Sequence, residues 1–335
     1  MGGDDDTRGD GYMEAYQSVI ANIPWLPIVG NHEFYDGDEL RRYLNQTEGT
    51  VVAHPADHPL VKGASSTADT ALGRILATGN HHGLGSNTHG TAKGVPSGTS
   101  RYYSVDFGLI HFVALDLNMY NGVDTCGETC RDAQLAWLEE DLKQANANRD
   151  SVPWIVAMSH FPLYCSNCPA PGRDPPGAWW NAEECEFSGH DPSCTGTGGV
   201  EDEGAAPKSG LTQNQMVPDF EPLFMKYGVD VYSSGHIHDY EFIYPTYNNT
   251  PVAKSFENPR APVHLVTGNG GPPTASRFYK IQPWSYVHST VYSYTKLVAH
   301  NASTMEWIQI ANNDSSILTS LTVTQNQHGQ FPIPK

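Results

Sequence analysis

Three apolar segments of this chain end directly at a histidine. The first runs through Ile28-Val29 into Gly30-Asn31-His32, the second through Val156-Ala157-Met158 into Ser159-His160, and the third through Tyr232-Ser233-Ser234 into Gly235-His236-Ile237-His238. Any one of these histidines alone is more often an ordinary loop or core residue. In open α/β sheets, however, ligands bind beyond the carboxyl ends of the strands, so three such ends are expected to converge on one crevice. Imidazole nitrogen and amide oxygen are ligands for zinc, iron or manganese, and the pattern therefore favours a metal site.

Apolar periodicity orders the rest of the chain. Helices are expected at about residues 11–21 and 132–145, and a third starts at the capping box Thr212-Gln213-Asn214-Gln215 and stops at Gly228. Strands are expected at 25–29, 102–116, 154–158, 229–233, 263–267, 292–299, 307–311 and 317–323. The order alternates β and α first and is β-rich afterwards. It predicts an α/β fold in which two packed mixed β-sheets are flanked by helices.

Residues 1–335 are expected to form a single domain with two irregular regions. Residues 54–100 are rich in Gly, Ser, Thr and His with little periodicity, which indicates a surface insertion. A second stretch, about 165–207, is rich in Gly, Pro, Asp and Cys and is expected to be a loop region.

The charge balance limits the possible partners. The formal net charge is −18, from 37 acidic and 19 basic side chains, which argues against nucleic acid or an anionic membrane as the main partner. No apolar run approaches the ~20 residues that span a bilayer. Small anionic substrates stay possible, because a bound metal can reverse the local field.

The chain carries marks of an exported protein, although its first ten residues are polar and acidic and do not resemble a signal peptide. Four Asn-X-Ser/Thr glycosylation acceptors are present: Asn45, Asn248, Asn301 and Asn313. We therefore expect a secreted or extracellular protein whose natural start lies upstream.

Six cysteines lie in the middle third of the chain: Cys126, Cys130, Cys165, Cys168, Cys185 and Cys194. The last four can also be interpreted as a zinc site, but the second pair lacks the usual C-x-x-C spacing. Disulfides are favoured, since they are the default in an oxidising compartment. Their pairing stays open, with Cys126 and Cys130 as the one pair that spacing suggests.

Three motifs in this order resemble those of the calcineurin-like metallophosphoesterases. The motifs are Gly30-Asn31-His32-Glu33, Ser159-His160-Phe161-Pro162 and Gly235-His236-Ile237-His238-Asp239-Tyr240-Glu241. The Tyr-Glu pair after the last histidine, the Tyr102-Tyr103-Ser104-Val105 strand and Thr267-Gly268-Asn269-Gly270-Gly271 are similar to the purple acid phosphatases in particular. The resemblance covers roughly residues 11–323.

The resemblance implies a function and roles for individual residues. Asn31, His160 and His236 would hold a divalent ion (zinc, manganese or iron), and His238 would hold ferric iron. His32 would orient phosphate and donate a proton to the leaving alkoxide, with Glu241 behind the metal ligands. The implied reaction is the hydrolysis of small phosphate monoesters, with a metal-bound hydroxide as the nucleophile.

The chain departs from the family pattern before Asn31. The family has Asp-X-Gly and Gly-Asp-X-X-Tyr there, and residues 1–30 contain neither motif in the family's spacing. Asp4, Asp5 and Asp6 are interpreted as a solvated acidic turn, and the histidines of residues 54–100 as solvated. We therefore expect residues 1–335 alone to have little phosphatase activity. The alternatives are a non-catalytic extracellular scaffold or binding protein on the same fold or, among enzymes, a phosphodiesterase or nucleotidase.

Overall fold

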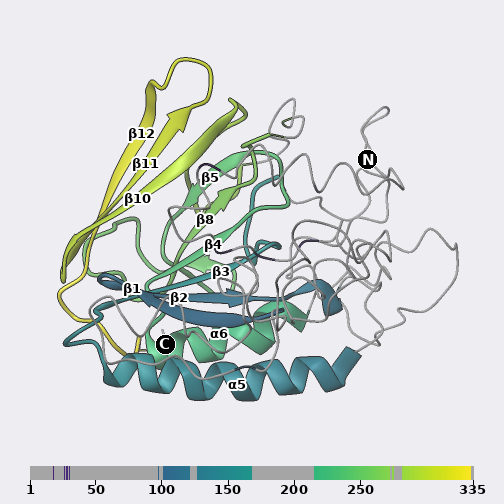
Figure 1. Cartoon of the computed structure of the whole chain (residues 1–335). Helices are drawn as coiled ribbons and strands as arrows, with labels where there is room; N and C mark the ends of the chain where they lie inside the picture. The colour runs from purple at the N-terminus through teal and green to yellow at the C-terminus, as the bar shows by residue number, and fades with distance from the viewer. Residues whose placement is uncertain are drawn as a thin grey trace, which may run out of the picture.

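The computed structural model describes residues 101–120, 127–167, 215–271 and 281–332, with a few isolated positions elsewhere. These residues form three layers, in which two helices cover one face of a large sheet and a smaller sheet packs on its other face (Figure 1). The expected helix at 11–21, the strand at 25–29, the insertion at 54–100 and most of the 165–207 region lie outside the described residues.

The large sheet has seven strands in the order β1-β2-β3-β4-β8-β5-β9. They are β1 (Tyr103–Phe107), β2 (Ile110–Leu115), β3 (Trp154–Ser159), β4 (Val231–Ser234), β8 (Val263–Thr267), β5 (Tyr240–Ile243) and β9 (Ser285–Ser289). Strands β2, β3, β4 and β8 run parallel, whereas β1 is antiparallel to β2 at one edge, and at the other edge β5 is antiparallel to β8 and β9 is antiparallel to β5. The four parallel strands therefore end at one edge of the sheet.

One strand prediction is wrong in its extent. The sequence predicts a single strand over 102–116, but the chain turns back at Gly108 and pairs Phe107 with Ile110. Gly108 has φ +59, a left-handed conformation that two-residue hairpin turns require and that glycine adopts without strain. The apolar run on both sides of Gly108 hides this turn in the sequence.

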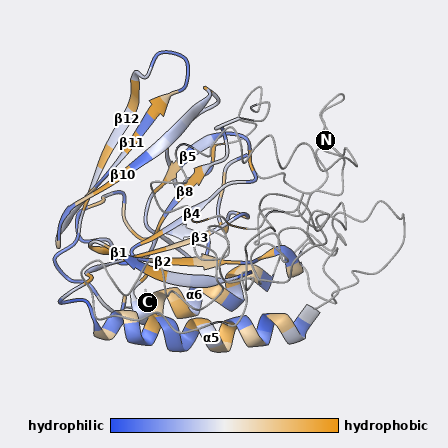
Figure 2. Cartoon of the chain, in the orientation of Figure 1, coloured by the Kyte–Doolittle hydropathy of each residue, from blue (hydrophilic) through white to orange (hydrophobic). Residues whose placement is uncertain are grey.

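The helical layer consists of α5 (Gly127–Ala147), α6 (Met216–Tyr227) and the short 3-10 helix η2 (Asn118–Tyr120). The buried residues of α5 follow a spacing of three and four along one side: Gln134, Trp137, Leu138, Asp141, Leu142 and Ala145. Figure 2 shows this alternation of apolar and polar positions along α5. Since a helix repeats every 3.6 residues, the buried side faces the sheet and forms a core with α6 and β2 to β4.

Helix α6 ends where the sequence predicts, at Gly228, which has φ +68. Its expected start is not supported among the described residues, because the N-cap is Gln215, which makes no side-chain capping hydrogen bond.

Among the described residues, no helix is long and apolar enough to cross a membrane.

The smaller sheet is antiparallel and contains β10 (Ser293–Asn301), β11 (Thr304–Ala311) and β12 (Ile317–Thr324). Its inner face packs Met305, Trp307 and Val323 against Phe242 and Leu265 of the large sheet. A two-stranded hairpin, β6 (Thr246–Tyr247) and β7 (Thr250–Pro251), completes the described strands. The predicted α/β architecture with two packed sheets is confirmed, with the correction that the described part of the second sheet is antiparallel and not mixed.

Candidate metal centre

Two of the predicted strand-to-histidine transitions lie side by side at the carboxyl edge of the large sheet. Strands β3 and β4 are parallel neighbours, and their last residues, Ser159 and Ser234, are paired. His160 follows the end of β3 at once, and His236 follows β4 after Gly235. The parallel register therefore brings the two imidazoles to the same level of the sheet.

The two imidazoles are in direct contact. Nε2 of His160 lies 2.8 Å from Nδ1 of His236, and the two ring planes are nearly perpendicular. The ring of Phe161 packs against both, with centroid distances of 5.0 Å and 4.7 Å. Both histidines are partly exposed.

Two consecutive tight turns carry the histidines that follow β4. The Ile237 N–H donates to the Gly235 carbonyl (2.7 Å), and the Asp239 N–H donates to the Ile237 carbonyl (2.8 Å), so His236 and His238 each occupy the centre of a three-residue turn. His236 has φ +59, a left-handed conformation that costs a non-glycine residue about 1–2 kcal/mol. Such strain persists only where the surrounding structure imposes it, and it concentrates at functional sites.

Gly268 holds these turns from the neighbouring strand β8. Its N–H donates to the Asp239 carbonyl (3.0 Å), and a Cβ at this position would lie 2.0 Å from the Ile237 carbonyl oxygen. Only glycine lets the two backbones approach so closely. The Gly-rich segment after β8, which sequence analysis included in the family resemblance, thus packs directly under the turn between His236 and His238.

Two buried carboxylates stand next to the histidine turns and tie down the loop that leaves β3. The Asn167 side-chain amide donates to Asp239 (2.9 Å), while the N–H and hydroxyl of Ser166 both donate to Glu241. Burial raises the pKa of Asp239 to about 7 and also raises the pKa of Glu241. Glu241 was predicted to stand behind the metal ligands, and its side chain contacts Ser166 of this loop and Ser285 of β9.

Sequence reasoning missed Asp239, Ser166 and Asn167. The position of Asp239 directly after His238 is the only signal in the sequence, because its contact with Asn167 joins residues 72 positions apart.

The geometry of the imidazole pair fits a shared divalent ion. With metal–nitrogen distances of about 2.0–2.1 Å and tetrahedral angles, two ligand nitrogens stand about 3.4 Å apart. The facing nitrogens of His160 and His236 are 2.8 Å apart, so a small rotation of either ring reaches that separation.

The described residues supply only part of a metal site. Among them, no group of three or more His, Cys, Asp or Glu side chains is placed to hold an ion. His238 lies on the second turn, and Asn31 and His32 lie outside the described residues. The four-ligand set expected from the sequence therefore stays a prediction, and the structure shows only that two of its members, His160 and His236, are in contact.

Three of the four predicted glycosylation acceptors lie on exposed turns or strand ends. Asn248 occupies the β6–β7 hairpin, Asn301 ends β10, and Asn313 lies between β11 and β12. Asn45 and four cysteines, Cys126, Cys168, Cys185 and Cys194, lie outside the described residues.

Comparison with known proteins shows two family models and several relatives that are similar to this chain. Residues 2–240 match the family model of calcineurin-like phosphoesterases, and residues 261–320 match that of the iron/zinc purple acid phosphatase-like protein C domain. The chain is 26% identical to acid phosphatase type 7 of Mus musculus, over 99% of this chain and 60% of the relative. It is 24% identical to a probable inactive purple acid phosphatase 1 of Arabidopsis thaliana, over 92% of this chain and 49% of that protein.

A solved purple acid phosphatase from yellow lupin seeds aligns with a TM-score of 0.48 and 23% identity, over 69% of this chain and 34% of its own. The chain thus spans about three fifths, or less, of the length of these relatives.

Proposed function

Because the chain belongs to the calcineurin-like phosphoesterase family and also matches the purple acid phosphatase-like C domain, we propose that it is an exported, metal-dependent phosphatase acting on small phosphate monoesters. The observation that carries this proposal is the contact between His160 and His236 at the carboxyl edge of the sheet. His236 has a strained left-handed backbone in that position, as residues at functional sites often do, and the family generally uses metal ions.

The proposed cofactor is a dinuclear centre of ferric iron and a divalent ion, zinc, manganese or iron. When bound, such a pair of ions would activate water as the nucleophile and neutralise the charge on the phosphate oxygens. On this chain, His160 and His236 present facing nitrogens to the divalent ion, with Asn31 as the proposed oxygen ligand. His238, on the second turn, is the proposed ligand of the iron.

The proton that the leaving alkoxide needs is assigned to His32, next to Asn31 in the sequence.

The net charge of the chain bears on how a phosphate ester would bind. The chain has a formal charge of −18, so it attracts cations, and only a bound cation makes the crevice attractive to phosphate. Removal of the metal by a chelator is therefore expected to remove substrate binding as well as turnover.

Export is supported by two features of the described residues. Cys130 and Cys165 are both disulfide-bonded, which is typical of oxidising compartments. Asn248, Asn301 and Asn313 are exposed, as glycan acceptors must be.

A second candidate function is a non-catalytic extracellular scaffold or binding protein on the same fold. Within the given sequence, residues 1–30 contain neither Asp-X-Gly nor Gly-Asp-X-X-Tyr. A hard trivalent ion requires anionic oxygen ligands, and a single imidazole does not replace them. One relative is itself named as probably inactive.

Hydrolysis of p-nitrophenyl phosphate at acidic pH, with iron, zinc or manganese added, separates the two functions. We compare residues 1–335 with a fusion in which the segment of a curated relative that carries the two missing motifs precedes Met1. The enzyme proposal predicts little turnover from residues 1–335 and metal-dependent turnover from the fusion, abolished by His238→Ala. A fusion that binds metal but does not hydrolyse the ester would favour the scaffold.

A further inference from the structure

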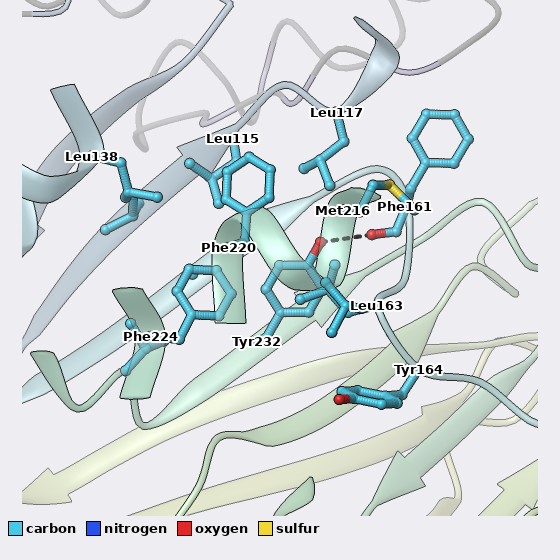
Figure 3. Close-up of a cluster of buried hydrophobic side chains, with 14 of the residues drawn as sticks. Leu115, Leu117, Leu138, Phe161, Leu163, Tyr164, Met216, Phe220, Phe224 and Tyr232 are labelled. Atoms are coloured by element: carbon cyan, nitrogen blue, oxygen red, sulfur yellow. Dashed lines mark hydrogen bonds between the residues drawn. The ribbon is translucent and has the colours of Figure 1, made fainter. Parts of the chain in front are cut away.

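A buried cluster of hydroxyl groups lies directly beneath the turn that carries His160. The carbonyl of Phe161 accepts a hydrogen bond from the Ser159 hydroxyl (2.7 Å) and another from the Tyr232 phenol (2.7 Å). The two hydroxyls also touch each other. Figure 3 shows the Tyr232 phenol pointing at the Phe161 carbonyl from the core side. Ser159 and Tyr232 are both almost completely buried, so water does not compete for these bonds.

The adjacent carbonyl in the same turn is also bound from β4. The Gly235 N–H donates to the His160 carbonyl (3.0 Å). Two successive carbonyl groups, those of His160 and Phe161, are thus held by Gly235 and Tyr232, which flank the end of β4. Strand β4 leads directly into His236, so the turn that carries one imidazole is fastened to the strand that carries the other.

We infer that Tyr232 is a positioning residue, whose phenol fixes the backbone of the His160 turn and thereby the approach of His160 to His236. This role needs a hydrogen-bond donor that is held rigidly and that keeps its proton, and Tyr232 meets both requirements. Its ring packs between Phe224 and His264, each with a centroid distance of 5.6 Å. Burial raises its pKa above the ordinary value, so the phenol keeps its proton.

Ser159 alone does not supply the same constraint. Its hydroxyl bonds to a carbonyl two residues away within the same turn, and it reaches β4 through its contact with the Tyr232 hydroxyl itself. Tyr232 reaches across from the neighbouring strand, 71 residues further along the chain. Of the two hydroxyls, only that of Tyr232 links the positions of the two histidines.

The test removes one hydroxyl group and leaves the packing in place. Tyr232→Phe deletes the phenol donor, and Tyr120→Phe is the matched control. Tyr120 is a buried tyrosine of the same core, and its hydroxyl donates to Asp219 (2.8 Å) on α6. Ser159→Ala serves as a second variant if Tyr232→Phe fails to fold, because it removes the other donor to the same carbonyl.

The first measurement uses the metal-free protein and does not depend on the proposed function. An imidazole N–H that is hydrogen-bonded to a second imidazole gives a downfield proton resonance in the NMR spectrum. The His160–His236 resonance is expected in the wild type and in Tyr120→Phe and is expected to be lost in Tyr232→Phe. Ser159→Ala is expected to weaken it.

The second measurement rests on the proposed function, since it takes the two imidazoles as metal ligands. Titration with Co²⁺ or Zn²⁺ is expected to show affinity about tenfold or more lower in Tyr232→Phe, the range typical of residues that orient metal ligands. Tyr120→Phe is expected to stay close to the wild type. Equal resonances and equal affinities in Tyr232→Phe and Tyr120→Phe would overturn the inference. A wild type that shows the resonance but binds no metal would refute the metal centre and leave the positioning role in place.

Discussion

His111 provides the sharpest quantitative prediction about the scaffold. It lies on β2, fully buried, between two carboxylates: Nδ1 is 2.6 Å from Asp106 on β1, and Nε2 is 2.9 Å from Asp141 on α5. Asp141 also accepts a hydrogen bond from Ser104 on β1 (2.6 Å). This cluster joins α5 to the β1–β2 hairpin by buried polar contacts, beside the hydrogen bonds between Gln134 of α5 and Asp116 directly after β2. The variant His111→Gln removes this imidazole.

The magnitude follows from the pKa of His111. Burial on its own lowers this pKa, but the charges of Asp141 and Asp106 and the hydrogen bonds to both outweigh burial and raise the pKa from 6.5 to about 9. At about 1.4 kcal/mol for each tenfold change in proton affinity, the protonated imidazole contributes about 3 kcal/mol. Because the folded pKa is the higher one, this stability is fully present below pH ~6.5 and is lost as the pH rises through about 9.

The assay is urea unfolding at a series of pH values from 6 to 9.5. The wild type is expected to lose about 3 kcal/mol of unfolding free energy across this range through His111. His111→Gln is expected to start lower, because two buried carboxylates then face each other without a cation, and to lack this pH-dependent loss. His300→Gln removes an exposed imidazole from a surface ion pair with Glu306 and is the control, with little expected effect. Parallel curves for wild type and His111→Gln, or an NMR titration of His111 below pH 7, would refute the reasoning.

Two further predictions concern the site and the compartment. Gly268→Ala places a Cβ 2.0 Å from the Ile237 carbonyl, so it is expected to lower the unfolding free energy by about 1–3 kcal/mol and to weaken metal binding, whereas Gly271→Ala, with open space around it, is expected to do neither. Thermal unfolding and a Co²⁺ titration check both, and equal behaviour of the two variants would contradict this role of Gly268. Intact mass measured with and without reductant and glycosidase is expected to show disulfides and at least one glycan, whereas six free thiols on an unmodified chain would reject the exported assignment.

Elements with clear local boundaries could be predicted from the sequence. Strand β8 was predicted with its observed limits, because an apolar β-branched run stops at Gly268. The end of α6 was also predicted, since Gly228 is the residue type that adopts the left-handed capping conformation there.

Elements that depend on distant partners were missed. Strand β9, Ser285–Ser289, is mostly polar and alternates between partly buried and exposed residues, so its pairing with β5 has no hydrophobic signature. Strand β5 is only four residues long and follows the histidine turns at once. Helix α5 begins at Gly127, earlier than the predicted residue 132, because its first turn lacks the apolar spacing on which the prediction depended.

The site, too, could be predicted where local sequence patterns determine it and not where distant contacts do. His160 and His236 could be chosen from the strand-end motifs, and parallel pairing predicted that they would share one edge. Their contact also depends on the left-handed backbone of His236, on the close approach of Gly268 and on the phenol of Tyr232. These are contacts between residues about 30 to 70 positions apart, which a local pattern does not encode.

Metal binding by residues 1–335 tests the central claim most directly. We titrate each protein with Co²⁺ and follow binding by the visible absorption of the ion and by native mass spectrometry. The proteins are the wild type, His160→Ala, His236→Ala and a control, His300→Ala, which changes an exposed residue on β10 of the smaller sheet. The account predicts one cobalt ion per chain, with imidazole ligation, in the wild type and in His300→Ala, and greatly reduced binding in the other two. Equal binding by all four proteins would contradict it, because the ion would then be held away from the His160–His236 pair.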